Sequence, residues 1–180
     1  NNPQTVEVKP GQTASVSFDN IKKRGVITVQ KSNANPSMGN YSLKGAVFEV
    51  RDQGGALVDT ITTNDSGVAT TKVLPLGVYR IKEVTAPYGF VLNGNTYTAT
   101  ISGSQGSDAI VYTPKTAIPE TPQAGIIKIE KTNANPSMGY YSLKGAVFEV
   151  RNKATGELMD TVTTNDDGYV KTKELPLGAH

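Results

Sequence analysis

Lys31 and Glu83 are the residues of this sequence whose types and positions best suit covalent chemistry. Lys31 ends the alternating run GVITVQK (25–31), and Glu83 lies in the run VYRIKEV (78–84). Successive side chains of a strand point to opposite faces, so Lys31 shares a face with Ile27 and Val29, and Glu83 shares one with Tyr79 and Ile81. Because an unpaired buried charge is costly, we expect this Lys and Glu to be neutralised or bonded to each other.

Burial would also make such a pair reactive. A low-dielectric environment lowers the pKa of a lysine and raises that of a carboxyl group, so both groups tend toward their neutral forms. A neutral amine can attack a carboxamide, and a protonated carboxyl group can polarise the carbonyl and shuttle protons. The alternative is that both residues lie at strand ends, where their long side chains reach water.

The elements that must position these residues are strands. Apolar and polar residues alternate in several short runs, including TVEV (5–8), AVFEVR (46–51), TYTATI (96–101) and IIKIEK (126–131). Turn signals such as KPGQ, TNDSG, APYG and LNGN separate the runs. Short strands with frequent turns predict an all-β sandwich or barrel. One short helical turn is expected around 35–39, where Pro36 and Ser37 can open it.

A long internal repeat sets the domain boundaries. Residues 33–51 and 133–151 differ only at Asn40, which is Tyr140 in the second copy. Residues 1–24 match the end of the first copy rather than its start, and the second copy stops at LPLGAH. The sequence therefore predicts a window cut from a tandem array. Its parts are the C-terminal strands of a preceding module (1–24), a complete sandwich (25–113), a Pro-rich semi-rigid linker (114–124) and a truncated second copy (125–180).

The composition excludes several classes of protein. The net charge is +2 with both signs mixed, which predicts no basic surface for nucleic acid. The chain has no cysteine, so disulfides and thiolate metal sites are impossible. No apolar run approaches the roughly 20 residues that span a bilayer, and the polar N-terminus is no signal peptide. His180 is the only histidine, and we expect no metal site and no cofactor.

The order of the motifs GVITVQK, LKGAVFEV, TTNDSG and LPLGVYRIKEVTAPYGF resembles the B-type repeat of the collagen adhesin Cna, also met as the SpaA-like pilin module. The resemblance covers the whole chain. It implies tandem prealbumin-like, immunoglobulin-related β-sandwiches of Gram-positive surface proteins. It further implies stalk or pilus modules, often with a self-formed Lys–Asn or Lys–Asp isopeptide bond. On this resemblance Lys31 and Lys131 are the candidate amines, and Glu83 is the carboxylate that assists the reaction.

The acyl partner is where the sequence departs from the family pattern. The resemblance places an Asn or Asp at the end of the last strand, and Asn20 fits this position for a preceding module. In the first copy the corresponding run ends in Tyr112 and Thr113, whose side chains have no acyl carbon, and Asp108 lies too early. We therefore predict no bond from Lys31 to residues 108–113. Lys31 and Glu83 would then remain a buried ion pair or hydrogen-bonded pair.

Three other motifs carry weaker signals. VYTPK (111–115) faintly resembles the pilin motif whose lysine is joined to the next subunit, which would make Lys115 a nucleophile, but the inserted Thr113 breaks the pattern. LPLG (74–77 and 175–178) is expected to be a turn that enters a strand. TNDSG and TNDDG are expected to be Asx turns in hairpins rather than calcium loops.

The sequence is compatible with two functions. The first is a stalk of a cell-wall-anchored adhesin or pilin, which projects a distal domain that could bind host extracellular matrix and resists force and proteolysis. The alternative is that the repeats themselves bind a ligand such as collagen. Turnover catalysis is not expected, because an isopeptide bond forms once per chain. The predicted partners are neighbouring modules of the same chain, and the predicted location is extracellular.

Overall fold

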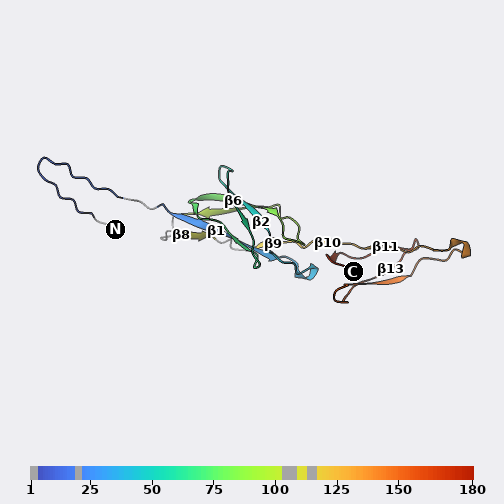
Figure 1. Cartoon of the computed structure of the whole chain (residues 1–180). Coiled ribbons are helices and arrows are strands. Elements are labelled where there is room, and N and C mark those ends of the chain that lie inside the picture. The colour runs from blue at the N-terminus through green and yellow to red at the C-terminus, as the bar shows by residue number, and fades with distance from the viewer. Residues whose placement is uncertain (1–3, 19–21, 103–108, 113–116) are drawn as a thin grey trace.

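A computed structural model describes residues 4–18, 22–102, 109–112 and 117–180 (Figure 1). These residues form strands and two single 3-10 turns, η1 (Pro36–Met38) and η2 (Pro136–Met138). The all-β prediction is confirmed, and so is the helical turn predicted around 35–39. Within the described ranges no helix has the length and apolar character needed to cross a bilayer.

One sheet of the first module is built around strand β1 (Arg24–Asn33), which pairs with all four other strands. Two partners run antiparallel to β1, and two run parallel to it. The antiparallel partners are β4 (Val68–Thr70) and β5 (Leu74–Pro75), and the parallel partners are β8 (Ala109–Tyr112) and β9 (Ile118–Glu120). The end of the module thus runs beside its beginning and in the same direction.

The second sheet is antiparallel, with the strand order β3-β2-β6-β7. Its strands are β2 (Val47–Asp52), β3 (Leu57–Thr62), β6 (Gly77–Thr85) and β7 (Thr96–Ile101). The core side chains come from both sheets and follow the predicted alternation. They include Ile27, Val29, Phe48, Val50, Ile81 and Ile101, each at most 2% exposed. The first module is therefore a β-sandwich.

The second copy forms the same hairpins without the strands that complete the sandwich in the first. Its strands pair in twos: β10 (Ala124–Gly125) with β15 (Leu175–Pro176), β11 (Lys128–Glu130) with β14 (Tyr169–Lys171), and β12 (Val147–Arg151) with β13 (Leu158–Thr163). The register repeats that of the first copy, since Glu49 lies opposite Thr60 and Glu149 opposite Thr161. Phe148 is only half-buried, whereas Phe48 is fully buried.

The predicted linker needs correction over the part that the structure describes. Ile118–Glu120 is not a spacer but strand β9, paired with Lys31–Asn33 of β1. Ile118 and Glu120 are buried while Pro119 is exposed, so the segment alternates like a strand of the sandwich. Pro122 continues the attachment through a bridge to Phe90. The prolines made this segment look like a linker in the sequence. A strand accepts a proline where the missing N–H would point away from the neighbouring strand.

Residues 4–18 are exposed and form no strand. The prediction that residues 1–24 close a preceding module stays a prediction.

Replacing Phe48 by Ala should destabilise the first module by about 3–5 kcal/mol, because the ring is fully buried between the sheets. Phe148→Ala is the matched control. Its ring occupies the same hairpin position but is only half-buried, so a smaller loss is expected. Urea unfolding followed by tyrosine fluorescence measures both, since the chain has no tryptophan. Equal losses in the two variants would contradict the assignment of a complete core to the first module alone.

Candidate functional site

The candidate site is built around Lys31, near the end of β1, whose side chain is buried in the first module. Its backbone N–H donates to the carbonyl of Gly67 over 2.8 Å. Gly67 has a φ of +71° and lies in the TNDSG turn, where a Cβ would approach Leu43 Cβ to 3.0 Å. Asn64 Oδ1 accepts hydrogen bonds from the turn backbone, as predicted for an Asx turn. This turn fixes the end of β1 and so aims the lysine inward.

Glu83 reaches Lys31 from the other sheet. It lies on β6, directly opposite Phe48 of β2, and is 1% exposed. Lys31 Nζ donates to Glu83 Oε1 over 2.9 Å and also lies 5.0 Å from the centre of the Phe48 ring. The predicted approach of Lys31 and Glu83 within hydrogen-bonding distance is confirmed. The alternative, in which the two side chains reach water, is wrong for this pair.

The third member of the site is Glu120, on β9, which the sequence analysis missed. Its side chain has no exposed surface, and Oε1 is in direct contact with Lys31 Nζ. Neither carboxyl oxygen of Glu120 accepts a hydrogen bond of ordinary geometry. The carboxyl group therefore depends on its contact with the lysine for compensation of its burial.

Asn93 connects the Glu83 carboxyl group to the strand that carries Glu120. Its backbone N–H donates to Glu83 Oε2 over 2.8 Å, so each oxygen of Glu83 has a donor. Its side-chain amide donates to Tyr97 Oη over 3.0 Å and to the Pro119 carbonyl over 3.3 Å. The loop after β6 thereby holds Glu83 and the strand that carries Glu120 in one arrangement.

The register of the parallel strands brings Glu120 to the lysine. The Cα of Lys31 lies opposite that of Ile118, and the backbone carbonyl of Glu120 accepts from Ala34 N over 2.9 Å. Ile118 and Glu120 share the inward face of β9, as Val29 and Lys31 share that of β1. The pattern Ile-Pro-Glu was the signal in the sequence that could have identified this residue.

Burial shifts the amine of this site toward its neutral form. Burial lowers the pKa of Lys31 below its usual value of 10.5, while the hydrogen bond and the negative charge of Glu83 oppose that shift. One amine compensates two carboxyl groups, and the side chains of all three residues are fully buried. Ionising all three would leave a net negative charge in the core, which is costly. Chemically, the site places an amine nucleophile against an acyl carbon, beside a second carboxyl group that can transfer protons.

The other predicted site residues do not join this cluster. Lys131 of the second copy is exposed. Asn20, Asp108 and Lys115 lie outside the described residues. The strand end at Tyr112, where the family resemblance places the acyl group, pairs elsewhere on β1, since Tyr112 lies opposite Ile27 rather than Lys31.

Comparison with known proteins gives a family match over most of the chain. The SpaA family, described as a prealbumin-like fold domain, matches residues 25–116 and 125–180. The trypsin-resistant surface T6 protein of Streptococcus pyogenes serotype M6 (strain ATCC BAA-946 / MGAS10394) is 39% identical over 84 residues. That alignment covers 43% of this chain and 16% of T6, so the chain spans only a small part of this relative.

A solved structure from Bacillus anthracis shows the same fold. The Bacillus anthracis TIE protein superposes with a TM-score of 0.66 at 26% identity, covering 87% of this chain and 27% of that one. BcpA, the major pilin subunit of Bacillus cereus, matches with a TM-score of 0.46 at 21% identity over 59% of this chain and 31% of BcpA.

Replacing Lys31 by Met should destabilise the first module by about 3–5 kcal/mol, because it leaves two buried carboxyl groups without the amine that compensates their burial. Lys131→Met, at the equivalent but exposed position of the second copy, should change stability by no more than about 0.5 kcal/mol. Urea denaturation of both variants measures the difference. A Lys31→Met chain as stable as the parent would contradict the proposed dependence of the core on this amine.

Proposed function

Because the chain belongs to the SpaA family of prealbumin-like fold domains, we propose that it is part of the stalk of a Gram-positive cell-surface protein. The stalk would be anchored in the cell wall and would hold a distal domain, able to contact host matrix, away from the cell. The relative T6 is a surface protein by name and resists trypsin, which supports this class of role. Amide formation in such a module is a single self-reaction rather than turnover.

The observation that carries the proposal is the parallel pairing of the first and last strands of the module. β1 enters the module at Arg24, and β9 leaves it at Glu120. A pull on the two ends of a module with this pairing loads its strands in shear. Many backbone hydrogen bonds then share the force, whereas peeling strands apart breaks them one after another. This arrangement suits a spacer that is pulled along its length.

We further propose that Lys31 and Glu120 are joined by an isopeptide bond. Lys31 Nζ, as the neutral amine, attacks Cδ of Glu120. Glu83 takes one proton from the amine and gives it to the departing hydroxyl, so one C–N bond forms, one C–O bond breaks, and one water leaves. The contact between Lys31 Nζ and Glu120, with Glu83 Oε1 at 2.9 Å on the same amine, supports these roles.

The bond relieves the electrostatic problem of the core. It replaces an amine and a carboxyl group by a neutral amide and leaves Glu83 as the only ionisable group of the three. Exclusion of water from the site also protects the amide from hydrolysis. The acyl donor is then a glutamate on the segment after the last predicted strand, in place of the Asn or Asp that the family resemblance implied. Asn20 and Lys131 remain proposed partners for bonds in neighbouring modules.

Intact mass under denaturing conditions tests the bond. The parent chain should weigh one water less than its sequence mass. Glu120→Ala should restore the full mass, and Glu83→Ala should leave much of the chain unreacted. Glu120→Gln keeps the side-chain length but changes the leaving group, so this variant should lose one ammonia in place of one water. A parent chain at full mass would refute the bond and leave the stalk proposal standing.

Single-molecule stretching of the chain from its two ends tests the mechanical role. With Lys31 joined to Glu120, residues 32–119 cannot extend, because the load passes through the amide. The Glu120→Ala variant should show an added unfolding step whose length corresponds to that segment at about 3.3–3.6 Å per residue. The same step in the parent would show that the load path is not covalent. If even Glu120→Ala unfolded without measurable resistance, the stalk role itself would fail.

A further inference from the structure

Tyr41 of the first module contacts the second copy directly. Tyr41 Oη accepts a hydrogen bond from the backbone N–H of Leu177 over 2.7 Å, and it lies 3.4 Å from the carbonyl oxygen of the same residue. Leu177 belongs to the LPLG turn of the second copy. The two residues are 136 positions apart in the sequence, so this contact depends on how the modules meet.

The first module holds this tyrosine firmly. The Tyr41 ring packs edge-on against Phe90 at 5.7 Å and against Tyr88 at 6.3 Å. It also covers Gly89, where a Cβ would lie 2.5 Å from the ring. The APYG turn therefore needs glycine at this position to seat the tyrosine. We call Tyr41 together with Tyr88, Gly89 and Phe90 the donor end of the module. The name refers to the module that supplies these residues to the junction and not to the direction of the hydrogen bond, which Tyr41 accepts.

Two segments meet at the donor end, Pro122–Ala124 directly before the second copy and Glu174–Leu177 within it, and together we call them the receiving face. Pro122 is buried and forms a bridge with Phe90. Gln123 donates from its backbone to the Gly89 carbonyl over 2.7 Å and from its side chain to the Phe90 carbonyl over 3.0 Å. The junction thus combines backbone pairing with the tyrosine contact.

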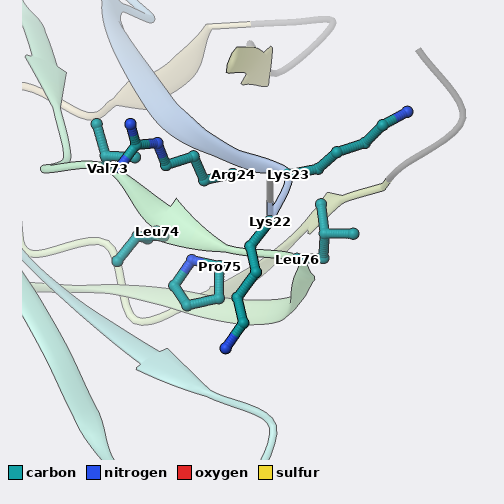
Figure 2. Close-up of a pocket in the computed structure, with 7 residues that line it drawn as sticks. All are labelled: Lys22, Lys23, Arg24, Val73, Leu74, Pro75 and Leu76. Carbon is teal, nitrogen blue, oxygen red and sulfur yellow. The ribbon is translucent and has the colours of Figure 1, made fainter. Parts of the chain in front are cut away.

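The first module has the equivalent strand pairing at its own front end. Lys22–Arg24 and Val73–Leu76 line a groove there (Figure 2). Aligned through the repeat, these segments match Pro122–Ala124 and Glu174–Leu177. The backbone register is identical as well, since Gly25 lies opposite Leu74 and Gly125 opposite Leu175.

The two faces differ in exposure. The face that lies against the donor end is less exposed than the groove of the first module, as contact with a donor end predicts. Leu177, which lies against the donor end, is half-buried, whereas the equivalent Leu76 is 44% exposed. Figure 2 shows Val73, Leu74, Pro75 and Leu76 at the groove together with the long side chain of Lys22, while Lys23 points away from it. The groove therefore keeps the backbone pairing and the LPL residues of a face that is covered elsewhere in this chain, with Lys22, Lys23 and Arg24 in place of Pro122, Gln123 and Ala124.

We propose that the groove of Lys22–Arg24 and Val73–Leu76 receives the donor end of another copy of this module placed ahead of it. The tyrosine of that copy accepts a hydrogen bond from the Leu76 N–H, as Tyr41 does from Leu177. Each module then carries a donor end at its back and a receiving face at its front. Successive modules dock in one fixed orientation, and the stalk is stiff at its junctions. This inference depends on the junction contacts and not on the Lys31–Glu120 bond.

The first test uses this chain. The chain has no cysteine, so spin labels attach only to cysteines that are introduced. The variant carries Thr60→Cys and Thr161→Cys, because both positions are exposed and are equivalent in the two copies. The distance distribution between the labels should be narrow. Adding Tyr41→Phe removes the phenol oxygen and keeps the ring, and it should broaden the distribution. Tyr141→Phe, at the equivalent tyrosine that is 77% exposed, should leave it unchanged. A broad distribution in the parent, or no effect of Tyr41→Phe, would overturn the proposal.

The second test examines the groove itself. In an extended chain, residues 22–121 are repeated once in tandem, so that a complete module precedes the groove of Lys22–Arg24 and Val73–Leu76. Labels on the Thr60 positions of the two complete copies should give the same narrow distance as the Thr60–Thr161 pair. Tyr41→Phe in the leading copy should broaden this distribution, and the same change in the following copy should not. A different or broad distance in the extended chain would show that the groove receives some other partner or none.

Discussion

The burial of one amine with two carboxyl groups is the constraint on which the first module depends. Lys31, Glu83 and Glu120 come from three strands and both sheets, and the side chains of all three residues are fully buried. A core of this kind is stable only when the charges are compensated by close contact or removed by reaction. The Asx turn at Asn64, the Asn93 loop and strand β9 all serve to hold these three groups together.

The same constraint explains why the module closes with a strand parallel to its first one. Glu120 reaches Lys31 only because β9 continues along β1 beyond the position of β8. The chain then leaves the module beside the donor end, where Pro122 and Gln123 contact Phe90 and Gly89. One short segment thus supplies the acyl group of the core and the backbone of the module junction. Internal closure and the joining of modules are coupled through residues 118–123.

Sequence reasoning identified what regular alternation reveals. The sandwich, the repeat and the inward phase of Lys31 and Glu83 all follow from side-chain periodicity in strands, and the structure confirms the fold and that contact. Glu120 was missed because its strand has only three residues and contains Pro119, so it resembled a linker. The Tyr41 contact could not be predicted either. It joins residues of two modules, and local sequence patterns carry no information on how modules meet.

Nuclear magnetic resonance of the chain labelled with nitrogen-15 at lysine side chains and carbon-13 at the glutamate Cδ tests the central claim most directly. The account predicts one lysine Nζ that carries a single proton and shows a one-bond coupling to a glutamate Cδ, and this signal should disappear in Glu120→Ala. If every lysine Nζ, including that of Lys31, behaves as an amine or ammonium group without coupling to carbon-13, the covalent account of this core is wrong.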